Sequence, residues 1–160
     1  MTLQTILNPL IRESKEVKGA KWIFPRPQNL EQEYKVEYKL HIIKMIGNIF
    51  PTFQDFEKAC KTGKPFTITP ELDSRIANRS HTQSKEELLG MIRTFRSYPE
   101  FRNEKTVQNL YDRMSSGGEL DMPILLKKRN TSRVLVMSGN TRMDVAFQMG
   151  DNPKCLVVEY

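Results

Sequence analysis

Apolar side chains recur at the spacing of amphipathic helices through the first 64 residues of the chain. This spacing predicts a short helix within residues 1–19, a long helix within 30–50 and a third within 52–64, with Thr52 as N-cap and Gly63 at its end. Two prolines and the only tryptophan fall within residues 21–29, which favours an extended connector. We therefore expect residues 1–64 to form a helical N-terminal extension.

The pattern changes after residue 64, where strand and helix periods alternate. A strand is predicted over residues 65–69 and ends at Pro70, and a hairpin of two strands is predicted over 122–139. Two helices lie between them, one with a Ser84 and Glu87 capping box and one with an Asn103 cap, and the segment 139–150 predicts a further helix before a closing strand over 155–160. Residues 65–160 are thus predicted to form one α/β (α+β) domain with a small mixed sheet flanked by helices.

The composition of the chain gives it a net positive charge. The chain has 38% hydrophobic and 28% charged residues and a formal net charge of +6, which attracts polyanions or anionic small molecules without choosing among them. No apolar run approaches the roughly 20 residues that span a bilayer, and Cys60 and Cys155 lack the spacing of a zinc site or a disulfide framework. The sequence predicts a cytoplasmic protein without a membrane partner.

The candidate chemistry begins at the turn between the predicted hairpin and its following helix. A strand that runs directly into a helix presents the first backbone N–H groups of that helix, which favour an anion. Gly139 allows close approach to the backbone, and Arg142 offers a forked donor for phosphate oxygens from the exposed start of the helix. The predicted phosphate site is Ser138, Gly139, Asn140, Thr141 and Arg142. The alternative is that Asn140 only caps the helix and Arg142 lies on a solvated face.

Two stretches in the second half of the chain resemble the ParB/sulfiredoxin-like superfamily. They are "TVQNLYDRMSSGGELDMPILLKK" and "VLVMSGNTRMDVAFQMG", in which a helix leads to a Pro-Ile strand, a hairpin and a Gly-x-x-Arg turn. The resemblance implies a nucleotide-binding fold over residues 65–160, with ATP or CTP phosphates at the turn and Mg²⁺ with them. It also implies that Thr106, Asn109 and Arg113 on the preceding helix line the nucleotide side.

This sequence departs from the family's motifs at positions that exclude some of the family's activities. Asn140 stands where sulfiredoxins need a cysteine, which excludes sulfinic acid reduction, and Thr141 replaces the second basic residue of chromosome-partition proteins. The resemblance implies that the segment after the first strand lies beside the turn, so that Glu71 or Asp73 would bind a metal or act as a base and Arg79 would neutralise phosphate. The alternative for this segment is a solvated loop with surface ion pairs.

The expected function is nucleoside-triphosphate binding with phosphoryl transfer or hydrolysis in a DNA-linked process, such as phage or plasmid DNA modification. A basic run in the hairpin is positioned for a nucleic-acid backbone, although a solvated hairpin is the alternative; its residues are Lys127, Lys128, Arg129 and Arg133. Two other functions stay open. One is a non-catalytic DNA-binding or regulatory module in which residues 1–64 form a partner-binding or dimerising surface. The other is a nuclease that holds metal with Glu71, Asp73, Glu119 or Asp121.

Overall fold

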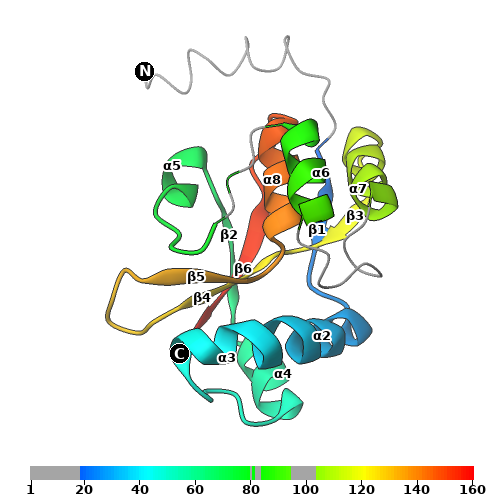
Figure 1. The fold of residues 1–160 in the computed structure, drawn as a ribbon. Helices are drawn as coiled ribbons and strands as arrows, with labels where there is room; N and C mark the ends of the chain where they lie inside the picture. The colour runs from blue at the N-terminus through cyan, green and yellow to red at the C-terminus, as the bar shows by residue number, and fades with distance from the viewer. Residues whose placement is uncertain (1–18, 80, 82–83, 95–103) are drawn as a thin grey trace, which may run out of the picture.

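The protein has a mixed α/β fold in which helices flank both faces of a small mixed sheet (Figure 1). The computed structural model describes residues 19–79, 81, 84–94 and 104–160. Its elements are β1 (Lys21–Ile23), α2 (Pro27–Glu33), the π-helix η1 (Tyr34–Ile42), α3 (Ile43–Ile46), α4 (Phe53–Lys61), β2 (Lys64–Thr67), α5 (Pro70–Asp73), α6 (Lys85–Thr94), α7 (Glu104–Ser115), β3 (Glu119–Asp121), β4 (Ile124–Lys127), β5 (Val134–Ser138), α8 (Asn140–Gln148) and β6 (Lys154–Glu159).

The main sheet has the strand order β2-β6-β4-β5. Strand β4 runs antiparallel to β5 and parallel to β6, and β2 runs antiparallel to β6. The predicted hairpin is therefore confirmed, with Leu126 opposite Leu135. The predicted strand after residue 64 is also confirmed, although it ends at Thr67 and Pro70 begins the short helix α5.

Alternation along the strands divides the core between the two faces of the sheet, as the period of two requires. One face buries Ile124 and Leu126 against aromatic side chains of η1 and α4, whereas Leu125 on the other face packs with Met143 of α8. Figure 1 shows the resulting layers, with α2, α3 and α4 on one side of the sheet and α6, α7 and α8 on the other. A third cluster joins α6, α7 and α8.

The predicted long helix within residues 30–50 is confirmed as the continuous run α2, η1 and α3. It begins at Pro27, so the end of the predicted extended connector is wrong, and its middle has π geometry. Tyr34 and Tyr38 lie in this π segment, and their buried rings stack with centroids 5.3 Å apart. The Tyr38 hydroxyl donates to the Gly47 carbonyl oxygen at 3.0 Å and accepts from the Phe50 N–H at 2.9 Å, so the aromatic core also fixes the loop that follows. The predicted boundary at residue 64 stays a prediction.

The helix ends test the predicted capping residues. Thr52 and Asp55 form a capping box at the start of α4, which confirms Thr52 as its N-cap. At the start of α6 the Ser84 hydroxyl accepts from the Glu87 N–H at 3.1 Å. Asn103 and the predicted helix within residues 1–19 lie outside the described residues.

A second, two-stranded sheet was not predicted. Strand β1, expected as part of an extended connector, pairs in parallel with β3, and Trp22 lies opposite Leu120. This pairing fixes the start of α2 beside β3, where the candidate site is found. Among the described residues, no helix is both long and apolar enough to cross a membrane.

Candidate functional site

The turn between β5 and α8 has the backbone that a glycine permits. Gly139 has a φ of +100°, and a Cβ atom at this position would lie 2.5 Å from Cβ of Pro123. Asn140 is the first residue of α8, and the N-cap position is Gly139, which has no side chain to cap the helix. The alternative in which Asn140 caps the helix is therefore wrong; its side-chain oxygen instead accepts from Arg79 Nη1 at 2.6 Å.

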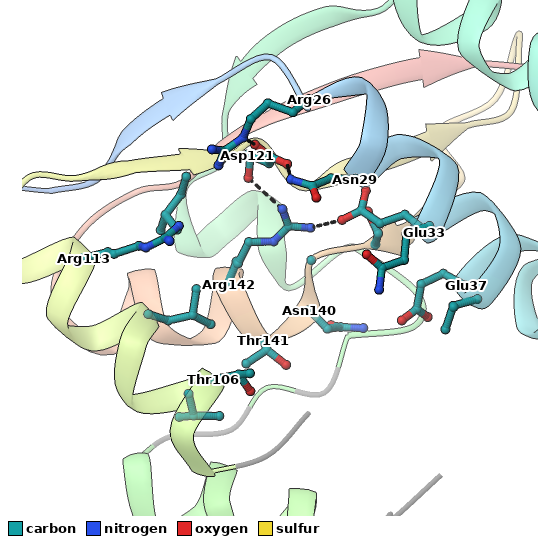
Figure 2. A pocket seen from close by; sticks show the side chains of 17 residues that line it. Arg26, Asn29, Glu33, Glu37, Thr106, Arg113, Asp121, Asn140, Thr141 and Arg142 are labelled. Atoms are coloured by element: carbon teal, nitrogen blue, oxygen red, sulfur yellow. Dashed lines mark hydrogen bonds and ion pairs between the residues drawn. The ribbon is translucent and has the colours of Figure 1, made fainter. Parts of the chain in front are cut away.

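A pocket of about 420 Å³ opens between this turn, the α2–η1 run and α7 (Figure 2). All five residues of the predicted phosphate site line it, and so do Thr106 and Arg113 of α7. Asn109 is exposed on α7 and is not part of the pocket wall. Two separate segments of the chain therefore meet in one cavity, and the predicted contact of their residues with a nucleotide stays a prediction.

An ion-pair network forms the wall of the pocket opposite α7. Asp121 of β3 is buried, and its carboxylate accepts from Arg26 Nε at 3.0 Å and from Asn29 Nδ2 at 2.6 Å. Arg142 donates to the Asp121 backbone oxygen at 2.9 Å and to Glu33 Oε1 at 2.7 Å. Figure 2 shows Arg142 reaching from α8 between these two partners.

The position of Arg142 corrects one expectation. The sequence suggested an arginine on the exposed start of a helix, but its side chain is only 15% exposed and pairs with Glu33, which is 18% exposed. Its fork therefore binds groups of the protein itself. A phosphate contact from this guanidinium would have to compete with the Glu33 carboxylate.

Two buried oxygen atoms of the pocket lack a hydrogen bond of normal geometry. They are Oγ of Ser138 and Oε2 of Glu33. Burial raises the pKa of Glu33, and the nearby Arg142 charge and the Ser138 hydroxyl oppose this shift. The Ser138 hydroxyl therefore acts on the Glu33 carboxylate within the pocket wall.

The predicted catalytic cluster does not reach the pocket. The side chain of Arg79 is 1% exposed, and its guanidinium donates to the carboxylates of Asp73 and Asp144 and to the side-chain and backbone oxygens of Asn140. Glu71 lies on the surface, where it pairs with Arg75 at 3.1 Å. The geometry gives no support to a phosphate contact by Arg79, which instead holds α5 against the start of α8.

The basic residues of the hairpin lie apart from the pocket, at the turn between β4 and β5. Lys128, Arg129 and Arg133 are exposed, whereas Lys127 is half-buried with its Nζ 3.8 Å from Glu159. Lys128 and Arg133 are joined through the backbone, because the Lys128 N–H donates to the Arg133 oxygen at 3.0 Å. The predicted contact with nucleic acid stays a prediction.

Metal and thiol chemistry receive no support from the part of the chain that the structure describes. No group of three or more histidine, cysteine, aspartate or glutamate side chains in it could hold a metal ion. Cys60 and Cys155 are both buried free thiols, and burial raises the pKa of each to about 12. A thiol with so high a pKa is a poor nucleophile at neutral pH.

Sequence reasoning missed several pocket residues. Arg26, Asn29 and Glu33 come from residues 1–64, which were not predicted to contribute to the nucleotide site, and Glu37 follows on η1. A signal was present, because Asn29, Glu33 and Glu37 recur at intervals of four, which places polar side chains along one helical face. That spacing alone does not tell a pocket wall from a solvated surface.

Comparison of the chain with protein-family models, curated proteins and solved structures found no match. The resemblance to the ParB/sulfiredoxin-like superfamily thus depends on the two quoted motifs. The function has to be argued from the pocket itself.

Proposed function

We propose that the protein binds a nucleoside triphosphate in the pocket between α2, α7 and α8, with its phosphates at the start of α8, and transfers or hydrolyses the terminal phosphoryl group. One observation carries this proposal. The uncapped turn at Gly139 shares one pocket with Thr106 and Arg113 of α7.

Several features of this pocket favour an anion. The first turn of a helix has backbone N–H groups without acceptors in the helix, and the helix dipole adds a partial positive charge there. Gly139 carries no side chain that would block the approach, and the Ser138 hydroxyl is buried at the same place without a hydrogen bond of normal geometry. Arg113 is exposed at the pocket rim and forms no ion pair with any described residue.

The rest of the pocket suits the base and sugar of a nucleotide. Its volume of about 420 Å³ lies within the usual range of small-molecule sites, roughly 300–1,000 Å³. Apolar side chains contribute on both sides of it, Val36 from η1 and Val107 and Leu110 from α7. A base or sugar can pack between such side chains while the phosphates bind at the turn.

ATP and CTP both fit this description, and Mg²⁺ would accompany either of them. Because Glu33 and Asp121 already pair with arginines, an ion in this pocket would be bound chiefly by phosphate oxygens and water, as is common for Mg²⁺. The exposed hairpin residues Arg129 and Arg133 support DNA as a partner of the reaction. Weakening of DNA binding with salt would test that part.

Thermal unfolding with each ribonucleoside triphosphate and Mg²⁺ tests the proposal. A ligand that binds only the folded state stabilises it by about 2.7 kcal/mol at a hundredfold excess over its dissociation constant. Arg113→Ala should reduce the resulting shift, whereas Arg129→Ala, which removes an exposed arginine outside the pocket, should leave it unchanged. The proposal fails if no triphosphate raises the melting temperature of the parent protein.

A further inference from the structure

A second pocket of about 240 Å³ adjoins the first on the far side of the turn. Its wall includes Glu37, His41, Ile42, Met45 and Val136. Four residues of this wall, Glu37, Ser138, Gly139 and Asn140, also line the first pocket. The two cavities therefore meet at the proposed phosphate-binding turn.

Glu37 is the carboxylate at this junction. It is half-buried on η1, and Figure 2 shows its side chain on the same side of the pocket as Asn140. The other two carboxylates that line the first pocket are Glu33 and Asp121. Neither of them lines the second pocket, so Glu37 alone among the described carboxylates touches both.

We propose that the second pocket binds the hydroxyl group that accepts the phosphoryl group, and that Glu37 is the general base of the transfer. This inference rests on the proposed function. The hydroxyl oxygen attacks the terminal phosphorus of the triphosphate and its proton passes to Glu37. As the new P–O bond forms, the bond from that phosphorus to the bridging oxygen breaks and a nucleoside diphosphate leaves. The proton on Glu37 then returns to solvent.

The wall of the second pocket indicates the class of acceptor. The described residues of this wall include a carboxylate and His41 but neither lysine nor arginine, so they offer no permanent cation to an anionic acceptor. Ile42, Met45 and Val136 give it an apolar side. An uncharged alcohol about as large as a sugar or a nucleobase fits these features. Water can take its place as the smallest acceptor.

Turnover of γ-labelled ATP with Mg²⁺ tests the assignment, with water, glycerol or thymidine as acceptor probes and the full-length chain as enzyme. Glu37→Gln should keep the ATP affinity of the parent and lose turnover by roughly a hundredfold or more, the usual effect of a general base. Glu37→Asp should recover part of it. Glu31→Gln is the matched control, because Glu31 is an exposed glutamate on the neighbouring helix and pairs with Lys35.

Met45→Trp tests the second pocket itself, since Met45 is 45% exposed and lines only that cavity. It should abolish labelling of the alcohol and spare ATP binding. Full turnover by Glu37→Gln overturns the inference. A loss of Mg²⁺-dependent ATP affinity in that variant also overturns it, because Glu37 would then be a metal ligand. A parent that binds ATP without any turnover also overturns it, whereas a parent that binds no triphosphate refutes the proposed function.

Discussion

Replacement of Arg142 by alanine separates a structural role from a ligand-binding one. The sequence suggested that this arginine holds little of the core, but the structure pairs it with Glu33 at 2.7 Å and with the Asp121 oxygen at 2.9 Å. Loss of one partner of a buried pair costs about 3–5 kcal/mol, because the other charge stays buried without compensation. Both side chains keep some exposure, so we expect the lower end, about 3 kcal/mol.

Protonation of Glu33 limits how much free energy of unfolding the protein can lose through the unpaired charge. Without Arg142 the carboxyl can take up a proton, and between its ordinary pKa of 4.5 and pH 7 this costs about 1.36 kcal/mol for each of 2.5 pH units, or about 3.4 kcal/mol. Arg142→Ala should therefore lower the melting temperature by about 6–12 °C, at 2–4 °C per kcal/mol for a chain of this size. The destabilisation should shrink on acidification, where Glu33 is protonated at less cost.

Calorimetry or thermal unfolding followed by circular dichroism measures this effect. The matched control is the double variant Glu33→Gln with Arg142→Ala, which removes the orphaned charge and should be more stable than Arg142→Ala alone. A single variant that melts within about 1 °C of the parent would refute the structural role. Equal instability of the single and double variants would show that the orphaned Glu33 charge is not the cause.

Three further changes concern Arg79, Gly139 and Glu33, and each is measured by thermal or denaturant unfolding. Arg79→Ala should destabilise the fold by about 3–5 kcal/mol, since it removes the buried guanidinium that pairs with the carboxylates of Asp73 and Asp144, and unchanged stability would contradict this. Gly139→Ala should cost at least about 1–3 kcal/mol because of the positive φ and the contact with Pro123; a neutral effect would contradict the described turn. Because burial raises the pKa of Glu33, the folded state binds the extra proton, and the parent should gain stability relative to Glu33→Gln as the pH falls from neutrality toward 4.5. A constant difference between the two proteins across that range would contradict the shift.

Local patterns predicted the elements that depend on local physics. The alternation around Leu126 and Leu135 predicted the β4–β5 hairpin because its turn joins neighbouring segments. Thr52 was recognised as a cap because its partner Asp55 lies three residues away. The π geometry of η1 was not predicted, since the apolar spacing at Tyr34 and Tyr38 is the same as in an α-helix.

Contacts between distant segments could not be predicted in the same way. The β1–β3 pairing joins strands of three residues almost one hundred positions apart, and strands this short have almost no periodicity of their own. The same separation concealed the partners of Arg142 and Arg79, because a sequence shows which residues carry charge but not which pairs meet. The turn at Gly139 was identified as part of a pocket, whereas the wall formed by Glu33 and Glu37 was not.

Titration of ¹⁵N-labelled protein with ATP and Mg²⁺, followed by the backbone amide signals, tests the central claim most directly. Binding at the start of α8 should shift the amides of Gly139, Asn140 and Thr141, with Thr106 and Arg113 following on the same curve. Saturation should give a dissociation constant below about 1 mM, which corresponds to roughly 4 kcal/mol of binding free energy. Absence of any saturable shift, or shifts confined to the hairpin at Lys128 and Arg133, would contradict a nucleotide site in this pocket.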